Sequence, residues 1–126
     1  MESDVNTPCY NRFMQVNELT IGIARLLLDF PQISLVYLFG SRAGGSIGPM
    51  SDYNLAILVD HAALDAAVQA SFTHSVTRWI GIAAVDAVLL NRAPVELAYQ
   101  VIADGQVLFQ RDLATRVEYE ANVMSR

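Results

Sequence analysis

The sequence contains no lysine, so its eight basic side chains are all arginine. Thirteen acidic residues give it a formal net charge of −5 at pH 7. A protein that holds DNA or RNA tightly needs many basic side chains, because its affinity depends on displacing counterions from the phosphate backbone. The composition therefore argues against directly bound nucleic acid, and an acidic surface suits a basic protein partner better.

Cysteine and long hydrophobic runs are also scarce. The only cysteine is Cys9, which excludes an internal disulfide and indicates a reducing compartment. The longest apolar run, near Leu19–Leu28, is interrupted by Arg25 and is too short to span a bilayer. No basic-then-apolar signal sequence is present. We therefore expect a cytoplasmic protein with no membrane contact.

The length of 126 residues indicates one domain. Residues 1–13 have no periodicity and are predicted to be a loose amino-terminal lead, whereas residues 14–126 form the domain. We expect no separate recognition domain, so any second half of a site must come from a partner. The apolar fraction is 53%, which is high for a small protein. A well-filled core explains part of this excess, and contact with another chain explains the rest.

The hydrophobic pattern alternates between helical periodicity and short, continuous apolar runs. Helices are predicted at 16–30, 62–79, 94–103 and from 112 onward, with a short one at 42–46. Strands are predicted at 33–39, 53–59, 82–90 and 106–109. This order predicts an α/β fold in which a small mixed sheet is covered by helices on at least one face.

A glycine-serine turn follows the strand at 33–39. Gly40 has no side chain to obstruct a close approach, and Ser41 can begin a helix whose backbone N–H groups bind phosphate oxygens. Arg42 can contact a phosphate or be solvated beside the turn. The turn is therefore a candidate nucleotide-binding element.

Three oxygen-bearing side chains follow the turn. Asp52 and Asn54 share one face at the start of a strand, because residues two apart point to the same side. Asp86 is the sole acid in the apolar run of the next strand, and we expect it to be buried and to need a cation or hydrogen bonds. Oxygen ligands held close together suit Mg²⁺. We therefore predict a metal site formed by Asp52, Asn54 and Asp86.

The pattern Gly40-Ser41, ten residues (42–51), then Asp52-Tyr53-Asn54 resembles the signature of the DNA polymerase beta-like nucleotidyltransferase superfamily. With the blocks at 85–94 and 104–112, it is most similar to the minimal nucleotidyltransferases, which serve as antitoxins beside HEPN ribonuclease toxins. The resemblance implies the nucleotidyltransferase fold, Mg²⁺ and ATP as the donor substrate. It further implies that Asp52 and residue 54 bind both metals. Asp86 would bind the catalytic metal and help deprotonate the attacking group.

Members of that family adenylylate a tyrosine of the toxin, or bind and cover it, so the resemblance implies a hetero-oligomer with the toxin. Asn54 stands where the family has an acid. An amide offers one neutral oxygen where a carboxylate offers two anionic ones, so we expect impaired catalysis. One alternative is an inactive antitoxin that acts sterically. Another is transfer to a small molecule such as an aminoglycoside, which the lack of a recognition domain disfavours.

Other features fit no second chemistry. The segment Gly44–Gly48 matches the Gly-x-Ser-x-Gly of serine hydrolases, but that motif needs its serine directly between a strand and a helix. Here the strand ends at Phe39 and Pro49 follows. His61 and His74 follow no zinc-site spacing. Trp79 is expected to pack in the core or in an interface.

Overall fold

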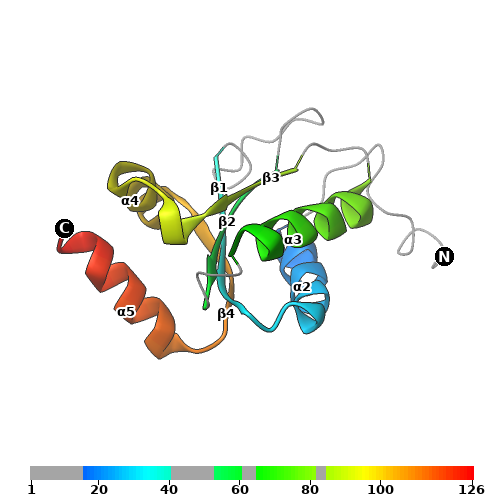
Figure 1. The fold of residues 1–126 in the computed structure, drawn as a ribbon, viewed down its shortest axis with the longest axis horizontal. Coiled ribbons are helices and arrows are strands. Elements are labelled where there is room, and N and C mark those ends of the chain that lie inside the picture. Colours follow the sequence, from blue (N-terminus) through cyan, green and yellow to red (C-terminus); the bar gives the residue numbers. More distant parts are fainter. Residues whose placement is uncertain (1–15, 41–52, 61–64, 82–84) are drawn as a thin grey trace.

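The computed structural model describes residues 16–40, 53–60, 65–81 and 85–126, and all structural statements below concern these residues. A four-stranded sheet with the order β3-β2-β1-β4 forms its centre (Figure 1). The strands are β1 (Ile33–Phe39), β2 (Tyr53–Val59), β3 (Val85–Leu89) and β4 (Gln106–Gln110). β1 pairs antiparallel with β2 and with β4, whereas β2 pairs parallel with β3. The predicted mixed sheet is therefore confirmed.

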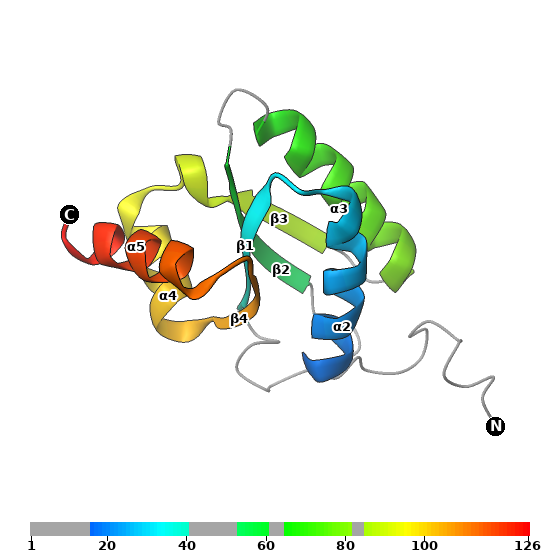
Figure 2. The ribbon, with the colours of Figure 1, turned by 90° about the horizontal axis from the view of Figure 1, so that it is seen from below.

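Helices cover both faces of this sheet (Figures 1 and 2). The helix α2 (Val16–Leu26), which the 3-10 turn η1 (Leu27–Asp29) continues, and the helix α3 (Asp65–Ile80) pack on one face. The helices α4 (Val95–Asp104) and α5 (Leu113–Met124) pack on the other. Six of the seven residues of β1 are buried, which is why that strand is an almost continuous apolar run.

Trp79 joins the two helices of the first face. It is partly buried and packs against the core of this face, as expected from the sequence. Gly22 of α2 lies directly beneath its indole ring, and a Cβ at this position would overlap the ring atoms. The absence of a side chain at Gly22 therefore lets α2 and α3 approach each other.

The end of β2 is fixed by Asn91 of the 3-10 turn η3 (Leu90–Arg92). The Asn91 side chain accepts a hydrogen bond from the Val59 N–H at 2.9 Å and donates one to the Val59 carbonyl at 2.7 Å. The Asn91 amide therefore bonds to the backbone of β2 beyond Leu89, where the pairing with β3 has ended. Arg92 donates at 3.0 Å to Asp65, a carboxylate that is only 1% exposed, and so ties η3 to the start of α3.

The outer helix α5 is anchored at its start and along its inner side. Asp112 caps it by accepting a hydrogen bond from the Thr115 N–H at 2.7 Å. Hydrogen bonding with the side chain of Thr115, followed by this bond to its backbone, lowers the pKa of Asp112. Tyr37 of β1 donates to Glu120 of α5 at 2.7 Å. Burial, followed by this hydrogen bond, raises the pKa of Tyr37, so the phenol keeps its proton and remains a donor.

The elements follow the sequence prediction with small shifts of their ends. The predicted helix at 62–79 is described from Asp65 to Ile80, and the predicted strand at 82–90 from Val85 to Leu89. The helix predicted at 94–103 spans Val95–Asp104, and the last strand extends to Gln110. The predicted lead at 1–13 and the short helix at 42–46 lie outside the described residues. Within the described ranges, no helix has the length and apolar character to cross a membrane.

Candidate active site at the sheet edge

Three strands bring candidate residues to one edge of the sheet. β1 ends there, whereas the parallel strands β2 and β3 both begin there. Phe39 of β1 pairs with Asn54 of β2, and Asn54 pairs in turn with Asp86 of β3. Gly40 directly follows Phe39. The sheet register therefore brings Gly40, Asn54 and Asp86 together, although 46 positions (40 to 86) separate the first from the last.

Asn54 and Asp86 point to the same face of the sheet. Their neighbours Tyr53, Leu55 and Ala87 belong to the core beneath α2 and α3. Since successive strand residues alternate between faces, Asn54 and Asp86 project toward the side that carries α4 and α5. This arrangement gives an amide and a carboxylate side by side.

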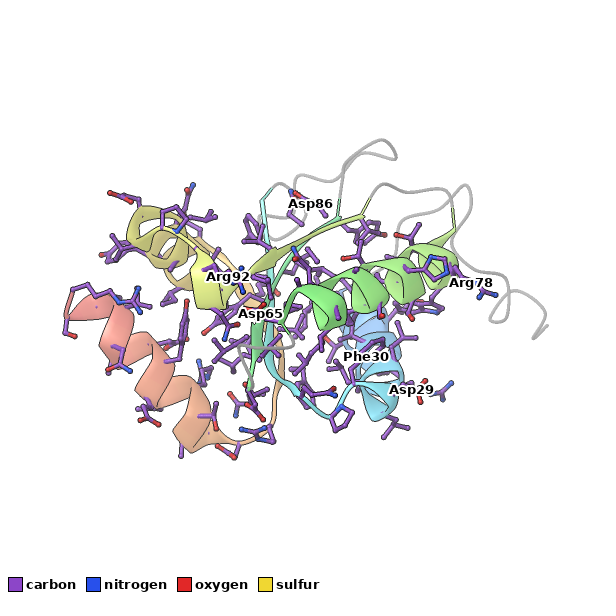
Figure 3. The ribbon with its side chains drawn as sticks, viewed as in Figure 1. Asp29, Phe30, Asp65, Arg78, Asp86 and Arg92 are labelled. Carbon is purple, nitrogen blue, oxygen red and sulfur yellow. The ribbon has the colours of Figure 1, made fainter. Side chains whose placement is uncertain are left out.

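Asp86 is exposed, so the expectation that it would be buried is wrong (Figure 3). The apolar residues around it predicted a strand covered on both faces. β3 is instead an edge strand, and Asp86 is its second residue, beyond the cover of the neighbouring helices. Because Asp86 is exposed, its charge does not need a bound cation to stabilise it. Its carboxylate is instead accessible to a cation or substrate from solution.

Gly40 and Asn54 are in direct contact. Gly40 has φ +88°, in the region that favours glycine, and a Cβ there would lie 2.6 Å from Nδ2 of Asn54. The amide of Asn54 thus occupies the space that a side chain at position 40 would fill. The conformation of the turn and the position of the residue 54 side chain are therefore coupled.

This coupling predicts how Gly40→Ala should behave beside Gly81→Ala. Gly81 has φ +98°, and among the described residues none beyond its chain neighbours comes within 4 Å of the position that a Cβ would occupy there. Alanine at this position should therefore cost only backbone strain, about 1–2 kcal/mol. Gly40→Ala should cost about 1–3 kcal/mol more in the free energy of unfolding, because it also displaces Asn54. Urea unfolding measures both values.

An Asn54→Ala background provides the control for this comparison. Removing the amide should reduce the cost of Gly40→Ala to that of Gly81→Ala. If Gly40→Ala costs the same with Asn54 present or absent, the two residues are not coupled in the way that the contact indicates.

The remaining predicted site residues, Ser41, Arg42 and Asp52, lie outside the described residues. In the part of the chain that the structure describes, no three histidine, cysteine, aspartate or glutamate side chains gather as a metal site. The donors that are described, a carboxylate at Asp86 and an amide oxygen at Asn54, are the oxygen ligands that Mg²⁺ prefers. The metal site that would also include Asp52 stays a prediction. The carboxylate of Asp86 and the amide oxygen of Asn54 are consistent with it.

Gln69 fixes β3 beside Asp86, a role that sequence reasoning missed. This residue of α3 donates a hydrogen bond at 2.6 Å to the carbonyl of Ala87, the residue after Asp86. Its neighbour Val68 lies in the core, so Gln69 stands at the border of the buried face of α3. A polar side chain at that border is the only local signal of this role. Gln69 therefore positions the strand that carries Asp86.

Comparison with known proteins agrees with this geometry. The family described as "Polymerase beta, Nucleotidyltransferase" matches residues 22–114. The protein adenylyltransferase MntA of Aphanizomenon flos-aquae (strain 2012/KM1/D3) is 31% identical over 105 residues, which cover 76% of this chain and 67% of MntA. The resemblance to the minimal nucleotidyltransferases is thus confirmed.

Solved structures extend the similarity to the fold. A chain of a toxin-antitoxin crystallised with AMP-PNP has a TM-score of 0.73 and 27% identity, over 84% of each chain. A chain from the complex of a tri-AMPylated Shewanella oneidensis HEPN toxin with its MNT antitoxin has a TM-score of 0.67 and 25% identity, over 86% of this chain and 84% of the other. The match over most of the sequence and fold shows that this chain belongs to the polymerase beta nucleotidyltransferase family.

Proposed function

We propose that this protein is an antitoxin of the minimal nucleotidyltransferase type, which binds a HEPN ribonuclease toxin and transfers an adenylyl group from ATP to a toxin tyrosine. The observation that carries the proposal is the similarity, over 84% of each chain, to a chain of a toxin-antitoxin that was crystallised with AMP-PNP. The 31% identity to a protein adenylyltransferase supports the reaction. A hetero-oligomer with the toxin follows from the same relatives.

In this proposal the Gly40 turn binds the triphosphate. Gly40 provides the positive φ that shapes the turn, Ser41 adds its hydroxyl and N–H group, and Arg42 adds a positive charge. Bound Mg²⁺ would neutralise phosphate charge and stabilise the pyrophosphate leaving group. Asp52, Asn54 and Asp86 are the residues that would hold it. The exposed carboxylate of Asp86 can also accept the proton of an attacking tyrosine hydroxyl.

We further propose that Asn54 weakens the transfer without weakening binding of the toxin. With an amide at position 54, the proposed metal ligands carry two negative charges, at Asp52 and Asp86, instead of three. A single neutral oxygen is also a poor bridge between two metals. The protein would then neutralise its toxin partly by covering it. Steric neutralisation alone is the second candidate function, and Asn54 is the observation that favours it.

The test starts from the neighbouring reading frame, which the proposal expects to encode a HEPN toxin. The toxin alone should degrade RNA, and added antitoxin should suppress this activity and co-elute with the toxin. Incubation with ATP and Mg²⁺ should then add adenylyl mass to the toxin, slowly, and Asp86→Ala should abolish that mass without preventing co-elution. Suppression of the nuclease with no added mass would leave only the steric function. No binding to the toxin would refute both.

A further inference from the structure

The outer face of α5 carries an apolar stripe, which we call the α5 stripe. Its residues are Leu113, Val117, Ala121 and Met124, spaced four, four and three positions apart. This spacing places them on one side of the helix. Leu113, Val117 and Met124 are 55%, 54% and 52% exposed, and Ala121 is exposed as well. The stripe therefore faces solvent along the full length of α5.

The α5 stripe is a concentration of apolar surface. The described residues include six large hydrophobic side chains that are exposed, and three of them lie on this stripe. The others are Ile21 of α2, Leu28 of η1 and Tyr99 of α4. Isolated exposed hydrophobics are ordinary, but a continuous stripe on one helix indicates an interaction surface.

We propose that the α5 stripe is a homodimer interface, in which α5 packs antiparallel against α5 of a second copy of this chain. A two-fold axis near residue 119 would place Val117 opposite Ala121 of the second copy, and Leu113 opposite Met124 of the second copy. Each large side chain then meets a smaller or flexible one, and the same contacts occur twice. An isologous interface requires this self-complementarity.

The charges at the ends of α5 favour the antiparallel arrangement. Asp112 at its start is 55% exposed at its side chain, and Arg126 beyond its end is also exposed. Antiparallel helices bring Asp112 near Arg126 of the second copy and set the two helix dipoles in opposition. A parallel pair would instead place like charges together. The charge pattern thus supports a second copy in one orientation.

The dimer would leave the candidate active site open. α5 contacts β1 and β4, whereas Asp86 lies on β3, at the opposite edge of the sheet (Figure 3). The inner side of α5 is held by Tyr37 and Glu120, so the stripe is presented on a fixed helix. Dimerisation through the α5 stripe therefore leaves Asp86 uncovered and does not depend on the proposed function.

The expected dimer is weak. A helix of this length is about 18 Å long, so two of them bury less than the roughly 1,600 Å² of a standard stable interface. We expect a dissociation constant of roughly 10–100 µM, and hence a monomer–dimer equilibrium that can be followed by sedimentation velocity from roughly 5 to 500 µM. The full chain is measured alone.

The disrupting variant is Val117→Glu, and its matched control is Ile21→Glu. Glutamate is a better helix former than valine, so Val117→Glu should fold normally while placing two negative charges near the axis. It should be monomeric throughout the concentration range. Ile21 is 59% exposed but lies on α2, on the opposite face of the sheet (Figure 2), so Ile21→Glu should dimerise like the unmodified protein.

A rescue experiment distinguishes interface loss from misfolding. An equimolar mixture of Val117→Glu and Val117→Arg should form a heterodimer, because opposite charges then meet near the axis. The proposal would be overturned if Val117→Glu dimerised as strongly as the unmodified protein. It would also be overturned if the unmodified protein were monomeric at every concentration. Failure of the mixture to associate would also overturn it. If the unmodified protein is a monomer and Val117→Glu abolishes its binding to the toxin, the toxin covers the stripe instead of a second copy.

Discussion

Asn54→Asp is expected to raise the rate of adenylyl transfer to the partner toxin by at least ~100-fold. Loss of a residue that merely supports a metal ligand costs about 10–100-fold, so restoring an anionic ligand to the metal itself should gain at least the upper end of that range. The change adds a second oxygen and a negative charge at the start of β2, beside Asp86. Mass spectrometry of the toxin after incubation with ATP and Mg²⁺ measures the gain.

The fold should accommodate Asn54→Asp with little adjustment. Asparagine and aspartate have nearly the same shape, and position 54 lies over Gly40, where no side chain competes for the space. Pairing of its backbone with Phe39 and Asp86 is unaffected. Magnesium and ATP affinity should therefore rise, whereas the free energy of unfolding should change by less than about 1.5 kcal/mol.

Two control variants make the result decisive. Asn54→Asp combined with Asp86→Ala should transfer nothing, because the neighbouring carboxylate is lost. Asn54→Ser keeps a small polar oxygen without adding charge and should stay as slow as the unmodified protein. No transfer by Asn54→Asp would favour a vestigial site and a steric antitoxin. Rapid transfer by the unmodified sequence would show that an amide at position 54 is sufficient.

The parts of the fold with a local signal were predictable from the sequence. β1 and β2 are central strands and therefore nearly continuous apolar runs, so both were predicted with their observed ends. Asp112 identified the start of α5, because an aspartate before a helical pattern is a typical N-cap. The sequence also predicted one site for Asn54 and Asp86 on successive strands, and the pairing of β2 with β3 places these two residues side by side.

The features that depend on contacts between distant segments were not predictable. Asp86 is exposed because β3 is an edge strand, and strand order has no local sequence signal. Gln69 and Asn91 each bond to backbone groups of a strand far along the chain. Their residue types would be equally ordinary on a solvated surface. The contact between Gly40 and Asn54 likewise appears only once β1 and β2 are paired.

Gly105→Ala is expected to destabilise the protein by about 3 kcal/mol. Gly105 ends α4, where its N–H donates to the carbonyl of Val101 at 2.8 Å. A Cβ at this position would lie 2.5 Å from that carbonyl oxygen and 2.9 Å from the carbonyl oxygen of Leu38 in β1. Both oxygens belong to the backbone and cannot rotate away as a side chain could.

The φ of Gly105 is −85°, which any residue can adopt, so the cost of Gly105→Ala comes from this overlap alone. Gly81→Ala is the converse control, because it strains the backbone at a position where the added Cβ meets none of the described residues. Urea unfolding with an unchanged m-value should show the larger loss for Gly105→Ala. Because Leu38 lies two residues before Gly40, the displaced strand should also shift the turn that we propose to bind phosphate. ATP affinity should therefore fall in Gly105→Ala and not in Gly81→Ala. A smaller loss of stability for Gly105→Ala than for Gly81→Ala would show that α4 moves freely away from β1, and that the turn is not held by this contact.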